Sequence, residues 1–142
     1  MKESSCGYRE REHTADWELE VWAPDLPGLF EQAARGMSAL ASVRLKDGPP
    51  LSRTLSLSAN DSEGLLVAFL AELLFLGSAE NGEGEPLGFD SFDISINGNA
   101  LHATVSGAPV LSLDKEIKAV TYHNLNIRRT AQGFRVNLVF DV

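Results

Sequence analysis

Apolar and polar residues alternate in two short stretches of the chain. In residues 17–22 the apolar positions 17, 19 and 21 face one way, whereas Glu18 and Glu20 face the other. This period of two is typical of a half-buried strand. In residues 51–59 apolar side chains alternate in the same way with Ser and Thr, and they predict a second strand.

Helical spacing replaces this alternation between the two predicted strands. Apolar residues recur every three to four positions from Leu26 to Ala41, which predicts an amphipathic helix with one buried stripe. Asp25 is suited to be its N-cap, and Pro27 falls in the first turn, where proline is tolerated.

A second helix is predicted over residues 65–76, where almost every residue is apolar. A helix of this composition is buried on more than one side. Asn60 and Glu63 have the spacing of a capping box ahead of it, although Asn replaces the usual Ser or Thr. The Gly-rich and acidic residues 77–88 then predict a loop inside one domain.

After this loop the chain contains only predicted strands. Residues 89–96 and 100–106 flank Asn97-Gly98, a strong hairpin signal. Residues 117–127 and 134–141 flank a longer turn that ends at Gly133. Two strand–helix units followed by four strands predict an α+β fold, a two-layer sandwich of one mixed sheet packed on two helices. We expect a single domain over residues 1–142.

Composition places the chain among ordinary globular proteins, with 44% hydrophobic and 23% charged residues. The single cysteine, Cys6, excludes an internal disulfide and a Cys-based metal cluster, and we expect it in a flexible N-terminal end. We find no apolar span of about 18 residues and no signal peptide. A cytoplasmic protein without membrane contact is expected.

The charge of the chain bears on its partners. Twenty acidic and twelve basic residues give a net charge of −8. Proteins that bind nucleic acid through its phosphates usually have Lys and Arg clustered on one face. The densest basic stretches here, Arg9–Arg11 and Arg128–Arg129, are both short, and the first is interleaved with Glu10. Direct nucleic-acid binding is therefore not expected, whereas a basic protein partner or a cation fits the charge.

Catalytic motifs are absent from the sequence. It contains no P-loop, no nucleophile elbow, no zinc-protease helix motif and no dinucleotide fingerprint. The three histidines lie at positions 13, 102 and 123, so that no two share a helical turn. No enzymatic activity is predicted, and a metal-dependent hydrolase would need a general base that no motif supplies.

Carboxylates stand at both ends of the predicted sheet. Asp16 directly precedes the first predicted strand, and the last strand runs into Asp141 and Val142. If these strands are neighbours, Asp16, Asp141 and the main-chain carboxylate of Val142 converge, and a cation must offset their repulsion. All-oxygen ligation suits Ca²⁺ or Mg²⁺, with Mn²⁺ also compatible. Taken alone, Asp16 fits a strand-start cap and Asp141 a solvated strand end equally well.

Five blocks of sequence, in order along nearly the whole chain, resemble the archease family. The blocks are Gly7-Tyr8-Arg9 leading into Glu12-His13-Thr14-Ala15-Asp16, the two helical segments Leu29-Phe30-Glu31-Gln32-Ala33-Ala34 and Glu72-Leu73-Leu74-Phe75, the internal motif Lys118-Ala119-Val120-Thr121-Tyr122-His123-Asn124-Leu125, and the ending Val139-Phe140-Asp141-Val142. Trp17 departs from the family pattern, in which an aliphatic residue commonly follows the Asp.

The resemblance implies a function and a site. Archeases are non-catalytic accessory proteins of RtcB-type RNA ligases in tRNA splicing and RNA repair, and they promote GTP-dependent guanylylation and multiple turnover of the ligase. The family implies a divalent-metal site, which here comprises Asp16, Asp141 and Val142. A chaperone-like action on a tRNA methyltransferase, also proposed for archeases, is the alternative function.

Two further residues are candidates beside this site. His13 could orient Asp16 through a hydrogen bond, or it could be a structural histidine. Lys118 could balance the carboxylates or contact the partner, or it could be an ordinary exposed strand residue. The sequence leaves both alternatives open.

Overall fold

The computed structural model describes residues 4–11 and 17–142. Within these residues the chain forms two helices and nine strands. The helices are α1 (Leu26–Ala41) and α2 (Ser62–Leu76). The strands are β1 (Gly7–Arg11), β2 (Trp17–Ala23), β3 (Arg44–Leu45), β4 (Leu51–Ser58), β5 (Leu87–Asn97), β6 (Ala100–Ser112), β7 (Ala119–Val120), β8 (Arg128–Thr130) and β9 (Gly133–Asp141).

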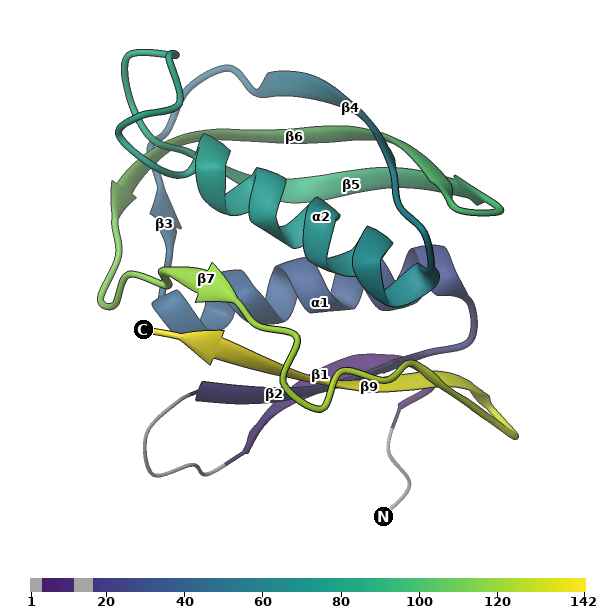
Figure 1. Ribbon diagram of the computed structural model, residues 1–142. Helices are drawn as coiled ribbons and strands as arrows, with labels where there is room; N and C mark the ends of the chain where they lie inside the picture. Colours follow the sequence, from purple (N-terminus) through teal and green to yellow (C-terminus); the bar gives the residue numbers. More distant parts are fainter. Residues whose placement is uncertain (1–3, 12–16) are drawn as a thin grey trace.

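The strands form two antiparallel sheets with both helices between them (Figure 1). The first sheet has the order β1-β2-β9-β7, and β8 also pairs with β9. In the second sheet β6 pairs with β3, β4 and β5. The predicted α+β class, with two helices packed on sheet, is confirmed, but two antiparallel sheets replace the single mixed sheet.

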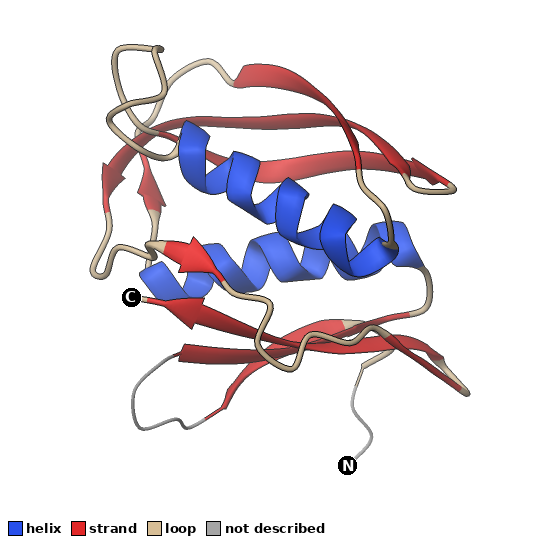
Figure 2. Cartoon of the chain, in the orientation of Figure 1, coloured by secondary structure: helices blue, strands red, loops and turns tan. Residues whose placement is uncertain are grey.

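The position of the helices explains their composition. α1 packs on β1 and β2 of the first sheet and on β5 of the second, whereas α2 packs on β4, β5 and β7 (Figure 2). A helix that contacts both sheets needs apolar side chains on opposite sides, which accounts for the uniformly apolar sequence of α2. The core lies in this middle layer, where the rings of Phe30 and Phe69 pack 5.9 Å apart and are fully buried.

Side-chain caps begin both helices. Asp25 caps α1 as predicted, because its Oδ1 accepts a hydrogen bond from the Gly28 amide at 2.7 Å. At α2 the predicted cap is wrong by one residue: Asp61 accepts from the Gly64 amide at 2.7 Å. Glu63 closes no capping box, since its Oε2 accepts instead from the amide of Ile127 at 2.9 Å.

The predicted hairpin is confirmed, and both of its strands are longer than predicted. Asn97 pairs with Ala100 at the turn, and Gly98 adopts a φ of 62° that favours glycine. The loop before this hairpin is organised by Asn81, whose Nδ2 donates to the carbonyl of Glu85 at 2.9 Å and whose Oδ1 accepts from the Glu83 amide at 2.7 Å.

The strand predicted over residues 117–127 is wrong except for β7. The amide of Leu125 donates to the carbonyl of Tyr122, and Asn124 has a φ of 52°, so the chain turns there. Apolar side chains in this segment, including the buried Ile117, anchor an irregular connection to the core. The spacing of apolar residues alone does not distinguish such anchoring side chains from the buried side chains of a strand.

Three short strands were not predicted: β1, β3 and β8. β1 is an edge strand that pairs along its whole length with β2, although no residue of β1 is buried. Cys6, expected in a flexible end, is partly buried and packs against the core. No helix in the described part of the chain is long and apolar enough to cross a membrane.

Candidate functional site

The end of β9 is held firmly in the first sheet. Phe140 is fully buried and Val139 is 4% exposed. Phe140 lies directly opposite Trp17 at the start of β2. Val142 is partly buried and packs against the core. The exposed Asp141 therefore lies between two anchored neighbours, Phe140 and Val142.

The other edge of β9 is covered by the internal motif. Ala119 pairs with Asp141 and Val120 pairs with Phe140. The amide of Lys118 donates to the carbonyl of Asp141 at 2.8 Å, and the amide of Thr121 donates to the carbonyl of Val139 at 3.0 Å. The backbone of Asp141 is thereby fixed, while its carboxylate stays exposed to solvent.

The structure places some of the predicted site residues and not others. Asp141 and Val142 stand together at the end of β9. Asp16 and His13 lie outside the described residues. Lys118 is brought beside Asp141 through its main chain, but Ala119 is the register partner of Asp141, so that the Lys118 side chain lies on the opposite face. Lys118 lines a pocket on that face.

The donor atoms at this edge suit a hard cation. Asp141 offers side-chain oxygens, and Val142 offers main-chain oxygens, which are the ligand type that Ca²⁺ and Mg²⁺ prefer. Glu18 shares the face of Asp141, because Glu18 pairs with Val139, two residues before it. Among residues 4–11 and 17–142, no group of three His, Cys, Asp or Glu side chains could hold a metal ion.

A pocket of about 690 Å³ adjoins this edge. It lies between the C-terminal ends of the two helices and residues 115–120, and most of its lining is apolar. Phe75 and Leu113 line it although they are 47% and 41% exposed. The pocket thus combines apolar surface with charged residues of both signs, Lys115 and Lys118 together with Glu80 and Glu116.

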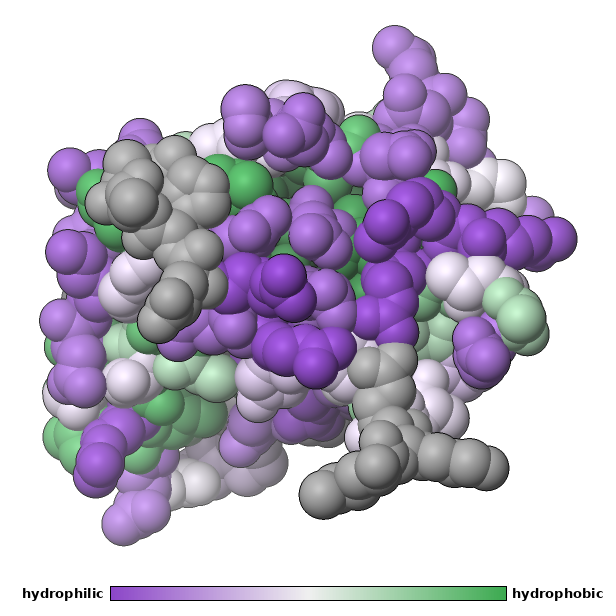
Figure 3. All heavy atoms as spheres, turned by 90° about the horizontal axis from the view of Figure 1, so that it is seen from below, coloured by the Kyte–Doolittle hydropathy of each residue, from purple (hydrophilic) through white to green (hydrophobic). Residues whose placement is uncertain are grey.

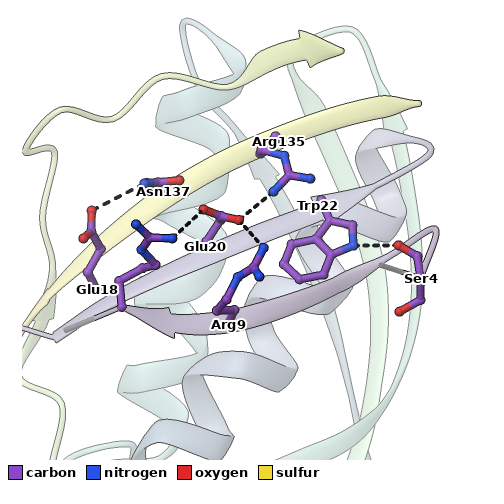
Figure 4. Close-up of polar contacts among 8 residues, drawn as sticks. Ser4, Arg9, Glu18, Glu20, Trp22, Arg135 and Asn137 are labelled. Atoms are coloured by element: carbon purple, nitrogen blue, oxygen red, sulfur yellow. Dashed lines mark hydrogen bonds and ion pairs between the residues drawn. The ribbon is translucent and has the colours of Figure 1, made fainter. Parts of the chain in front are cut away.

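A network of charged residues covers the outer face of the first sheet, the face turned away from the helices. Glu20 is its centre, with a side chain only 13% exposed. Arg135 and Arg9 contact Glu20 Oε1 at 2.6 Å and 2.7 Å, and Arg11 approaches Oε2 at 3.5 Å (Figure 4). Burial raises the pKa of Glu20, but the Arg9 hydrogen bond and the charges of the three arginines outweigh it and hold the pKa below its ordinary value of 4.5.

Trp22 lies within the same network. Arg9 and Arg135 stack over its ring at 5.0 Å and 5.1 Å from the centroid, and its Nε1–H donates to the carbonyl of Ser4 at 2.8 Å. The pattern of residues along the chain does not reveal this cluster around Glu20 and Trp22. The alternation in residues 17–22 places Glu20 outward, but only the strand register shows which arginines meet it.

The fold and this sheet edge define a class of small α+β proteins, and comparison with known proteins shows the family. Residues 8–142 match the model of the archease protein family (MTH1598/TM1083). Protein archease of Methanosarcina barkeri is 31% identical, with 100% of each chain covered. Protein archease of Thermococcus gammatolerans is 34% identical over 86% of this chain and 88% of its own. The chain belongs to the archease family.

Solved structures agree with this assignment. The solution structure of Methanobacterium thermoautotrophicum protein 1598 matches with a TM-score of 0.67 and 25% identity, covering 96% of this chain and 99% of that protein. A crystal structure from Thermotoga maritima, of a protein described as an archease and possible chaperone, has the same fold with a TM-score of 0.67 and 22% identity, covering 94% of this chain and 96% of its own.

Proposed function

We propose that this protein is a non-catalytic, metal-binding accessory protein of an RtcB-type RNA ligase. In this role it promotes guanylylation of the ligase, so that one ligase molecule joins many RNA ends in tRNA splicing and RNA repair. Family membership supports the proposal at the level of the family. The particular partner follows from the resemblance described in the sequence analysis.

The observation that supports the proposed metal site is the pairing of Trp17 with Phe140 in neighbouring strands. Asp16 precedes Trp17 in the sequence, and Asp141 follows Phe140. The register therefore supports a site in which Asp16, Asp141 and the main-chain carboxylate of Val142 bind one divalent ion, Ca²⁺ or Mg²⁺ or, alternatively, Mn²⁺. When bound, the ion would offer its remaining coordination positions to an oxygen of the partner.

The residues of this chain hold and orient that site. The main-chain bond from Lys118 to Asp141 and the packing of Val142 fix the backbone that carries these carboxylates, while the Asp141 side chain stays exposed to solvent. A backbone held in place before binding reduces the conformational entropy lost when a cation binds. The net charge of −8 favours approach to a basic surface of the ligase.

The test is ligation of an RNA with a 3′-phosphate end under excess substrate, with the cognate ligase, GTP and a divalent metal. We expect the wild-type protein to raise the number of ligations per ligase molecule. Asp141→Ala should not raise it, whereas the matched control Asp93→Ala, an exposed carboxylate on β5 of the second sheet, should act as wild type does. No stimulation by the wild-type protein would reject the ligase as the partner.

A second candidate function is chaperone-like modulation of a tRNA methyltransferase. The apolar pocket with exposed Phe75 and Leu113 favours it, because such surface can bind apolar segments of another protein. Pull-down from a native lysate separates the two candidates. The ligase should dominate the bound fraction under the first proposal, and a methyltransferase should dominate under the second.

A further inference from the structure

Exposed large apolar side chains gather around the pocket at the C-terminal ends of the two helices. Within the described residues five large apolar side chains are exposed, and three of them, Phe75, Leu111 and Leu113, lie at or just beyond the ends of α2 and β6. Phe75 and Leu113 line the pocket itself. The outer face of the first sheet is, by contrast, strongly hydrophilic across its middle (Figure 3). We call the pocket and these three side chains the apolar end.

We propose that the apolar end is a docking surface for the ligase, and that a large apolar side chain of the ligase occupies the pocket. The inference rests on the proposed function and deepens it, because it names a second contact beside the metal site. The occupant is an aromatic or long aliphatic side chain, on a segment of the ligase that carries charges of both signs.

The pocket and the proposed metal site share residues. Lys118 and Ala119 line the pocket. The amide of Lys118 donates to the carbonyl of Asp141 at 2.8 Å, and Ala119 pairs with Asp141. These residues belong to or adjoin β7, which ends the strand order of the first sheet. A protein that places an oxygen on a metal ion at Asp141 therefore reaches around this edge to the pocket.

The metal site is too small to hold a partner by itself. Specific protein–protein interfaces bury about 800 Å² on each partner. Two or three carboxylates around one ion present only a small part of that area, so the contact must extend over neighbouring surface. The buried centre of an interface is apolar, and the apolar end supplies such surface beside Asp141.

The walls of the pocket are held in place before a partner binds. Residues 77–80 and 86–88 form one wall, and the loop between them is fixed by Asn81, whose Nδ2 donates to the carbonyls of Leu76 and Glu85. Lys46 ties the same loop to the second sheet through an ion pair with Glu85 at 3.1 Å. A pocket that needs little rearrangement to accept a side chain is typical of the sites that supply most of the binding energy in an interface.

The charges around the pocket favour a protein segment over a free ion. Among the lining residues, Lys115 and Lys118 stand against Glu80 and Glu116, so their charges sum to zero. A small anion or cation gains little from a balanced set of charges. A protein segment with charges of both signs can be complementary to it.

The test measures binding of the full chain to the immobilised cognate ligase by biolayer interferometry, in the presence of divalent metal. Phe75→Gln and Leu113→Gln should each weaken binding about tenfold or more, the loss expected when a side chain at the centre of an interface is removed. Both variants should bind Ca²⁺ in isothermal titration as wild type does. Phe75→Leu keeps an apolar side chain at the pocket and should bind the ligase with nearly wild-type affinity.

Tyr8→Gln is the matched control, because Tyr8 is a large apolar side chain that is 38% exposed on β1 and does not line the pocket. It should bind the ligase as wild type does. An equal loss of affinity in this control would overturn the inference, since exposed apolar surface of any kind would then be sufficient. Thermal unfolding of each variant shows that it is folded.

The outcomes separate this inference from the proposed function. If wild type raises ligase turnover but the pocket variants bind the ligase as tightly as wild type, the inference alone is rejected. If binding depends on the pocket but turnover does not rise, the proposed function alone is rejected. Pocket variants that keep the ligase and lose a methyltransferase in the lysate pull-down would assign the pocket to the second candidate and overturn the inference.

Discussion

Trp17 lies directly opposite Phe140 where β2 runs antiparallel to β9. Phe140 is fully buried and Trp17 is partly buried against the same core, so the pair fixes the start of one strand to the end of the other. Asp141, the next residue along β9, is held beside this pair by β7. The end of β9 that carries Asp141 thus rests on a core contact.

Replacement of Asp141 with Asn should weaken divalent-metal binding without loss of stability. The amide has the size of the carboxylate but lacks its charge. Even residues that only orient a ligand contribute about 10–100-fold to metal affinity, so a direct ligand should contribute at least as much. Isothermal titration with Ca²⁺, Mg²⁺ and Mn²⁺ measures the effect. Asp93→Asn is the control, and the free energy of unfolding of both variants should stay within about 0.5 kcal/mol of wild type.

Residues added after Val142 should abolish metal binding and ligase activation while leaving the fold intact. An extension converts the main-chain carboxylate of Val142 into a neutral amide, whereas the Val142 side chain keeps its packing against the core. Titration calorimetry and the ligation assay check this expectation, with a tag of equal length at the N-terminus as the control. Full activity of the extended protein would exclude the Val142 carboxylate from the site.

Glu20→Gln should destabilise the protein at neutral pH but not at strongly acidic pH. The three arginines lower the pKa of Glu20 in the folded state below its ordinary 4.5. A lowered folded-state pKa adds stability that is present above about pH 4.5 and is lost as the pH falls through the folded value. We expect a loss of roughly 1.5–3 kcal/mol at neutral pH, the range for hydrogen bonds to a charged group.

Urea unfolding of wild type and Glu20→Gln across this pH range measures the difference. The two proteins should converge as the pH falls below the folded-state pKa of Glu20. A difference that persists unchanged into acid would mean that the carboxylate charge is not what stabilises the network. Glu18→Gln serves as the comparison. Within the described residues, the Glu18 side chain accepts a single hydrogen bond, a long one of 3.5 Å from Asn137.

Asp61→Ala should cost about 1 kcal/mol of stability, within the usual range of 0.5–2 kcal/mol for loss of an N-cap. Its side chain accepts from the Gly64 amide at the start of α2. Asn60→Ala should cost much less, since the Asn60 side chain does not cap the helix. Thermal or urea unfolding of the two variants distinguishes them, and a larger loss for Asn60→Ala would contradict the observed cap.

Elements whose patterns depend on near neighbours are predictable from the sequence alone. The N-cap at Asp25, the stripe of α1, the uniformly apolar α2 and the turn at Gly98 each follow from residues a few positions apart. The sequence blocks that run in order along nearly the whole chain, among them the motif containing Lys118 and the ending at Asp141 and Val142, together indicate the family. These features are local, and local sequence encodes them because helix spacing, strand alternation and turn chemistry act over a few residues.

Features that depend on strand pairing are visible only in the folded chain. The register of Trp17 with Phe140 joins residues more than a hundred positions apart in the chain. The division into two sheets depends on which strands pair. The edge strand β1 has no buried residue, so its sequence lacks the apolar face that would reveal it. Strand partners are selected by burial of the whole core, and no window of sequence contains that information.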